Sequence, residues 1–221
     1  MSQLHVDSVS KAYNNKVILS DVYLNCKIGE IKGLIGRNGS GKSTLLKIIF
    51  GVENAEYKFI RVDGKIIKSV SDGRNIINYL PQDNFLPNGI YIQTLINIFL
   101  NTKEKKTVLN NEYVKPLLKK KNQHLSTGEK RIIEILLIIH SEAKFILLDE
   151  PFNGLSPIIK NYVVSYIKAN KTKKGFIITD HDYENVTALS DEIAFLKNGY
   201  LKKLNNKKEL IDLGYLTINS F

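Results

Sequence analysis

The sequence predicts an α/β fold with a parallel-sheet core, an antiparallel β subdomain and a mainly helical subdomain inserted at about residues 88–140. The core is predicted from short, almost wholly apolar runs, because parallel strands are buried on both faces. Such runs occur at 30–35, 145–148 and 175–179, and a helix is expected at about 157–169. The alternation of buried strands with helices is typical of α/β proteins.

The antiparallel subdomain is predicted from the N-terminal residues. Residues 3–9 and 16–28 alternate apolar and polar side chains, as half-buried strands do, with two asparagines as the turn between them. A short strand pair is expected in 58–68 around an Asp-Gly turn, and another strand at 76–80. The residues from 192 to 204 predict a hairpin that turns at an Asn-Gly pair.

The helical subdomain lies between these strands, within one continuous domain expected to span residues 1–221. From about residue 88 to 140 the apolar spacing is mostly helical, and its connections near 101–106 and 119–123 are rich in lysine and asparagine. The sequence contains neither internal repeats nor a disordered linker. We therefore expect a single domain with the helical subdomain as an insertion.

A complete phosphate-binding loop follows the first buried run. It fits the pattern G-x-x-x-x-G-K-[ST] and is formed by Gly36, Arg37, Asn38, Gly39, Ser40, Gly41, Lys42, Ser43 and Thr44. The loop stands between a strand and a helix that ends at Gly51, the context in which backbone N–H groups converge on a phosphate. Lys42 is expected to meet the β- and γ-phosphates, and Ser43 to offer its hydroxyl to Mg²⁺. These observations predict a P-loop NTPase core.

A second nucleotide motif ends the buried run at 145–148. Asp149 and Glu150 emerge at its carboxyl end, the edge at which open α/β sheets bind ligands. Asp149 is suited to hold Mg²⁺, and Glu150 to polarise a water for attack on the γ-phosphate. Upstream, Ser126 and Glu129 have the spacing of a capping box that opens a helix reaching His140.

These motifs, in this order, resemble the nucleotide-binding subunits of ABC (ATP-binding cassette) transporters over nearly the whole chain. The resemblance implies that ATP and Mg²⁺ bind, with Tyr13 stacked on adenine. It implies that Gln82 contacts Mg²⁺ or the attacking water and that His181 contacts the γ-phosphate, so that Glu150, His181 and Gln82 are catalytic. The implied metal-binding residues are Ser43, Gln82 and Asp149.

The resemblance also implies that the site is shared between two subunits. The segment from Leu125 to Glu129 matches the family's signature motif, in which Ser126, Gly128 and Glu129 contact the ATP of the opposite subunit. The implied partners are a second ABC ATPase subunit, identical or different, and a separate transmembrane permease docked around the helical subdomain and Gln82. Hydrolysis of ATP then powers transport.

Two positions depart from the family pattern. Thr127 replaces a glycine of the signature motif, and its β-branched side chain is expected to crowd a phosphate. Ser156 stands where the family's D-loop has aspartate. It is expected to cap the next helix, but it cannot carry a charge across the dimer interface.

Other functions fit part of the pattern. A DNA-repair or chromosome-organising ATPase would have a long coiled-coil insertion, but only 84 residues without sustained heptads separate Lys42 from Ser126. The changes at Thr127 and Ser156 leave open a switch that binds ATP and hardly hydrolyses it. Short strings resemble the branched-chain amino-acid and lipopolysaccharide-export branches of the family, yet cargo and direction stay open.

Composition sets the expected location. The chain of 221 residues has a net charge of +10, for which we favour a solvated basic surface over nucleic-acid binding, so no nucleic-acid partner is expected. The single Cys26 agrees with a reducing compartment, and its place indicates an ordinary strand residue. The N-terminus lacks a signal-peptide pattern. We expect a cytoplasmic protein, peripheral on the inner face of the cell membrane.

Overall fold

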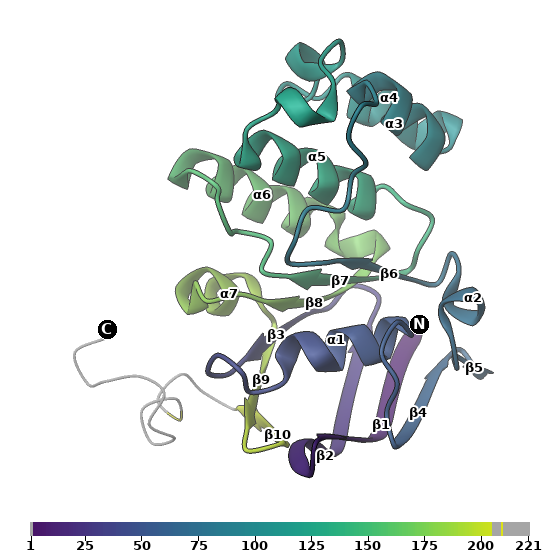
Figure 1. Ribbon diagram of the computed structural model, residues 1–221, viewed down its shortest axis with the longest axis vertical. Coiled ribbons are helices and arrows are strands. Elements are labelled where there is room, and N and C mark those ends of the chain that lie inside the picture. The colour runs from purple at the N-terminus through teal and green to yellow at the C-terminus, as the bar shows by residue number, and fades with distance from the viewer. Residues whose placement is uncertain (1, 205–208, 210–221) are drawn as a thin grey trace.

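A six-stranded sheet forms the centre of the computed structural model, which describes residues 2–204 and 209 (Figure 1). Its strands, in spatial order, are β10 (Tyr200–Leu204), β9 (Glu192–Lys197), β3 (Ile31–Ile35), β8 (Gly175–Thr179), β7 (Phe145–Asp149) and β6 (Ile77–Leu80). All neighbouring pairs are parallel except β9 and β10, which form the predicted hairpin. Every residue of β3, β7 and β8 is buried, as their apolar sequences predict.

A second sheet is antiparallel and contains the N-terminal residues. Its order is β2 (Lys16–Lys27), β1 (Gln3–Tyr13), β4 (Tyr57–Val62) and β5 (Lys65–Ile66). The predicted β1 strand ended at residue 9, whereas the observed strand continues to Tyr13. Irregularities in its register with β2 explain the difference, because each bulge shifts the alternation of buried and exposed side chains.

Helix α1 (Lys42–Phe50) packs between the two sheets (Figure 1). Its buried side chains, such as Leu45 and Ile48, share one hydrophobic cluster with Leu4 of β1 and Leu147 of β7. The helix ends where Gly51 adopts a φ of 98°, a left-handed conformation that glycine tolerates. The antiparallel sheet therefore packs against the helix that follows the glycine loop.

Most of the remaining helices cover the opposite face of the central sheet or extend beyond it. Helices α5 (Thr127–Ile139), α6 (Pro157–Asn170) and α7 (Tyr183–Leu189) bury apolar side chains against this face. Helices α3 (Ile92–Phe99) and α4 (Thr102–Leu109) pack on α5 in a separate hydrophobic cluster, farther from the sheets (Figure 1). The other helical segments in the described residues are short: α2 (Val70–Gly73), Lys115–Leu117, Asn122–His124 and Lys171–Lys173. Among the described helices, none combines the length and the apolar character needed to cross a membrane.

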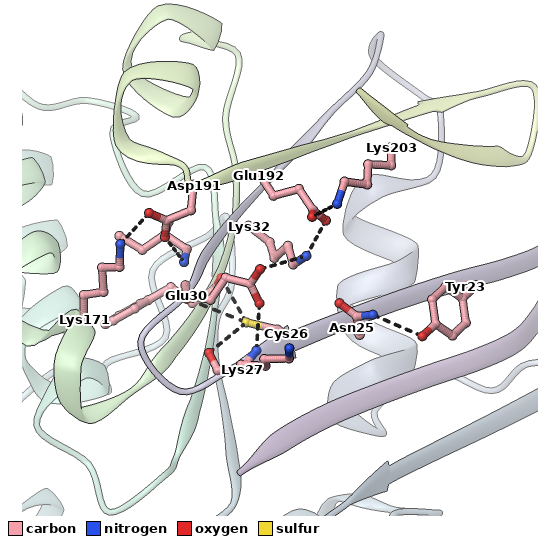
Figure 2. A network of polar contacts seen from close by, with 12 residues as sticks. Tyr23, Asn25, Cys26, Lys27, Glu30, Lys32, Lys171, Asp191, Glu192 and Lys203 are labelled. Carbon is pink, nitrogen blue, oxygen red and sulfur yellow. Dashed lines mark hydrogen bonds and ion pairs between the residues drawn. The ribbon is translucent and has the colours of Figure 1, made fainter. Parts of the chain in front are cut away.

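A network of polar contacts, buried at Lys32 and Cys26, joins the two sheets (Figure 2). The ammonium of Lys32 on β3 lies 3.0 Å from the carboxylate of Glu30 and also contacts Glu192 on β9. Cys26 is buried in β2, as expected for a strand residue, and its thiol donates to the carbonyl of Phe176 at 3.5 Å. Burial raises the pKa of this thiol to about 12, so it stays protonated at neutral pH.

Candidate active site

The glycine loop between β3 and α1 forms one wall of the site. Gly39 and Gly41 have φ values of 75° and 104°, and a Cβ at Gly41 would lie 2.8 Å from the side chain of Ile18. Lys42 begins α1, and its ammonium donates to the carbonyl of Gly36 at 2.8 Å. Burial lowers the pKa of Lys42, while the charges of Glu150 and Asp149 oppose this shift. The loop therefore has the backbone shape and the cation that a phosphate requires.

Asp149, the last residue of β7, connects the glycine loop with β6, the strand that lies next to β7. Its carboxylate accepts a hydrogen bond from the Ser43 hydroxyl at 3.0 Å and another from the Tyr79 hydroxyl at 2.8 Å. Burial raises the pKa of Asp149, and these two hydrogen bonds act in the opposite direction. Ser43 and Asp149, each predicted to bind Mg²⁺, are therefore neighbours, and Tyr79 is an additional partner of Asp149.

Glu150 turns the chain sharply after β7. Its φ is 50°, a left-handed conformation uncommon for a residue with a side chain, and its N–H donates to Thr179 of β8 at 2.7 Å. The carboxylate accepts from the amide of Gln82 at 2.9 Å and lies 2.7 Å from Nε2 of His181. Burial raises the pKa of Glu150, and the charge of His181 opposes the shift. The three residues predicted to be catalytic thus meet at one point.

These groups surround a cavity of about 340 Å³. Its lining consists of Tyr13, Ile18, Asn38, Gly39, Gly41, Lys42, Ser43, Thr44, Gln82, Glu150 and His181. Tyr13 is 43% exposed, and the ammonium of Lys11 lies 4.5 Å from the centre of its ring. The cavity therefore contains cationic, carboxylate and aromatic groups of the kinds that recognise a nucleotide.

The predicted signature residues lie elsewhere. In the described part of the chain, Ser126, Gly128 and Glu129 do not line this cavity. Ser126 caps α5 by accepting from the N–H of Glu129 at 3.2 Å, and its own N–H donates to the Glu129 carboxylate at 2.7 Å. The predicted capping box is confirmed, and α5 begins at Thr127. One chain thus has two separate groups of predicted nucleotide-binding residues.

The D-loop residue Ser156 differs from its prediction in one respect. It occupies the N-cap position of α6, as expected. However, its side chain makes no capping hydrogen bond within the described residues. Pro157 follows it at the first helical position and fixes the start of α6 through its ring instead.

The sequence did not indicate two of the residues at the site. Tyr79 lies on β6, and its sequence position gave no sign that its hydroxyl would reach Asp149 on β7. Arg131 follows a lysine on α5 and resembles a surface charge, yet it is buried and donates to the carbonyls of Asp149 and Glu150. The presence of Glu134 nearby in an apolar run was the one signal of a buried ion pair.

Comparisons with known proteins agree with this geometry. A family model described as ABC transporter matches residues 19–153. A probable ABC transporter ATP-binding protein of Azorhizobium caulinodans is 31% identical over 86% of this chain and 73% of its own length. The lipopolysaccharide export system ATP-binding protein LptB of Escherichia coli (strain K12) is 28% identical over 91% and 89%, respectively.

A solved structure confirms the predicted fold class. The ATP-binding subunit of an ABC transporter superimposes with a TM-score of 0.83 at 24% identity, covering 96% of this chain and 93% of that one. The family match and the sequence relatives extend this likeness from fold to function. The chain therefore belongs to the ABC transporter family, as an ATP-binding subunit with ATPase activity that powers a transporter.

Proposed function

We propose that the chain binds ATP with Mg²⁺ in the cavity beside Lys42 and that two ABC ATPase subunits close head to tail over two ATP molecules. The observation that carries this proposal is the separation of two groups of residues. Lys42, Ser43 and Glu150 line the cavity, whereas Ser126 opens a helix outside it. Two copies related by a two-fold axis would complete two sites.

The residues beside the loop suit Mg²⁺. The Asp149 carboxylate and the Ser43 hydroxyl are already neighbours, and both are oxygen donors of the type that Mg²⁺ prefers. Gln82 supplies a third polar group at the same cavity. When bound, Mg²⁺ would neutralise charge on the phosphates. Among these residues, we assign Ser43, Gln82 and Asp149 to the metal.

Hydrolysis is assigned to the group around Glu150. Its carboxylate is suited to accept a proton from the attacking water, and Gln82 and His181 hold it from two sides. The left-handed backbone at Glu150 supports this role, because strained conformations concentrate at functional sites. Tyr13 would stack on the adenine at the open end of the cavity.

The proposed role as a transporter ATPase also implies the partners of the chain and its location in the cell. We assign the whole chain to one ABC ATPase domain, with residues of about 88–140 as its helical subdomain. A separate transmembrane permease would dock around this subdomain and Gln82. The exposed Tyr91, Ile98 and Phe99 are consistent with such a contact. The protein would act in the cytoplasm, at the inner face of the membrane, without nucleic acid.

Turnover and dimerisation of a Glu150→Gln variant test the proposal. Removing the carboxylate is expected to lower kcat by about a hundredfold or more and to trap an ATP-dependent dimer, detected by light scattering after size-exclusion chromatography. The exposed Glu112 provides a matched control, Glu112→Gln, that should behave as wild type. Turnover equal to wild type in Glu150→Gln would refute the catalytic assignment, and failure to dimerise would refute the two-subunit site.

A second candidate is an ATP-binding switch that hardly hydrolyses ATP. It is favoured by Thr127 and Ser156, which depart from the family pattern at the edge that meets the other subunit. The same measurements separate the two. A switch would show wild-type turnover no higher than that of Glu150→Gln, and it would still dimerise with ATP.

A further inference from the structure

A buried arginine connects the signature helix to the catalytic carboxylate. Arg131 on α5 is only 2% exposed. One of its terminal nitrogens donates to the carbonyl of Asp149 at 2.7 Å and to that of Glu150 at 2.9 Å. The other donates to the carbonyl of Pro81 at 2.7 Å. Burying a guanidinium is costly unless its donors form hydrogen bonds, and both terminal nitrogens of Arg131 do so.

The bonds to Asp149 and Glu150 fall where the backbone leaves β7. Glu150 has its left-handed φ at this point, and its N–H is held by Thr179 of β8. Arg131 holds the carbonyl of the same residue. Both polar backbone groups of Glu150 are therefore fixed, and this sets the direction in which its carboxylate leaves the chain, toward Gln82 and His181.

The bond to Pro81 fixes the second member of the catalytic group. Pro81 immediately precedes Gln82, whose amide donates to Glu150. On the far side of Gln82, the N–H groups of Phe85 and Leu86 donate to the buried carboxylate of Glu134 at 2.9 and 3.4 Å. Glu134 also lies on α5, 3.5 Å from Arg131. Helix α5 thus holds the chain on both sides of Gln82.

We propose that Arg131 is a positioning residue for ATP hydrolysis, whose guanidinium sets the Glu150 carboxylate and the Gln82 amide relative to each other. The role depends on the planar fork of arginine, which spans three carbonyls on two segments of chain. A lysine would present a single ammonium there and could not reach all three in the same geometry. The proposal rests on the proposed catalytic role of Glu150.

An Arg131→Lys variant tests this role by separating turnover from binding. We expect kcat to fall by about tenfold or more, an increase of about 1.4 kcal/mol in the activation free energy. The Kd for a fluorescent ATP analogue is expected to stay within about twofold, because Lys42 and Tyr13 are untouched. The exposed Arg74 gives the matched control, Arg74→Lys, with wild-type values. An unchanged kcat, or a Kd that rises as much as kcat falls, would overturn the proposal.

Two further variants distinguish positioning from support of the fold. Arg131→Gln leaves no buried ammonium and is expected to show the same loss of kcat. If both Arg131 variants fail to fold, Arg131 serves the fold and the proposal is wrong. Glu134→Gln retains the guanidinium and an acceptor for Phe85, so its kcat should fall by less than about threefold. An equal loss in Glu134→Gln would assign the effect to general packing of α5 and overturn the role of Arg131.

The proposed function can fail independently of this inference. If Glu150→Gln retains wild-type turnover, the carboxylate is not catalytic, whatever Arg131 does. If Glu150 is catalytic, the double variant Glu150→Gln with Arg131→Lys should still form the ATP-dependent dimer, because positioning concerns hydrolysis alone. Loss of that dimer in the double variant only would show that Arg131 serves ATP-driven association, contrary to the proposal.

Discussion

The cavity beside the glycine loop and the signature edge at the start of α5 are built in different ways. At the cavity, Glu150 and the neighbouring Asp149 are buried and hydrogen-bonded to residues far away in the sequence. At the edge, Ser126 and Thr127 are exposed, and the capping box joins Ser126 only to Glu129, within one turn of helix. The first region is fixed by the tertiary structure, and the second by a local helix start.

This difference separates what one subunit can do from what requires two. Groups that must hold phosphates in a defined geometry are placed by several strands at once, so the cavity is preorganised within one chain. The edge presents a capped helix N-terminus, which is a feature that can bind an anion. It lies outside the cavity that is proposed to hold the phosphates of the same chain. Substitutions in the cavity should therefore change ATP binding and turnover, whereas those at the edge should change only dimer-dependent steps.

The largest effect is expected from Lys42→Met. The variant removes the buried cation that lines the cavity and is assigned to the phosphates, and we expect ATP affinity to fall by about a hundredfold or more. Equilibrium titration with a fluorescent ATP analogue measures this loss in the monomer. Lys47 lies exposed on the same helix, so Lys47→Met is the matched control. An affinity within about threefold of wild type would contradict the assignment of the cavity to phosphate binding.

The pH dependence of turnover gives a second contrast. Burial raises the pKa of Glu150 above its ordinary value of 4.5, so the folded protein holds this proton more tightly than a free carboxyl does. Since we assign the ionised form as the base, kcat should fall as the pH drops through the raised pKa, on a limb above 4.5. At the edge, the N–H of Ser126 lowers the pKa of Glu129, which stays ionised over this range.

Kinetics at saturating ATP from neutral pH downward would locate this limb, with circular dichroism to show that the protein stays folded. The limb belongs to the Glu150 carboxylate, which lies in contact with His181. ATP-dependent dimerisation of Glu150→Gln should lack it. A limb at or below 4.5 would contradict the burial of the carboxylate proposed to be catalytic.

The fold was predictable wherever it depends on local pattern. Strands β3, β7 and β8 follow from apolar runs, and the turn between β4 and β5 from its Asp-Gly pair, with φ values of 51° and 83°. The extension of β1 was not, because bulges in a strand depend on its partner rather than on its own sequence.

The residues of the site also differ in whether local sequence or distant partners determine their place. The motif residues from Gly36 to Thr44, and the pair Asp149 and Glu150, stand out because their chemistry requires fixed spacing in the chain. Tyr79 and Arg131 act through partners many residues away, and nothing in their own surroundings distinguishes them from a core tyrosine and a surface arginine. The assigned roles of all these residues stay predictions until the variants are measured.

Restoring the signature glycine with Thr127→Gly tests the edge directly. The methyl group of Thr127 packs toward Gly154, and its removal opens the approach to the helix N-terminus. We expect dimerisation with ATP and turnover to increase by about threefold, while the Kd of the monomer for ATP is unchanged. Thr127→Ser, which removes only the methyl group, should show part of the gain. A change in monomer affinity would contradict the separation of the two regions.

The smallest effect is expected from Ser156→Asp, which supplies the capping bond that Ser156 does not make in the part of the chain that the structure describes. A carboxylate at the N-cap of α6 can accept from the N–H groups of the first turn and is favoured by the helix dipole. It should stabilise the protein by about 0.5–1 kcal/mol. Urea denaturation measures this gain, and Ser156→Asn reports the cap without the charge. If Ser156→Asp alone raises dimer-dependent turnover, the charge acts across the interface between subunits. If both variants are no more stable than wild type, Pro157 already fixes this helix start and leaves a cap nothing to add.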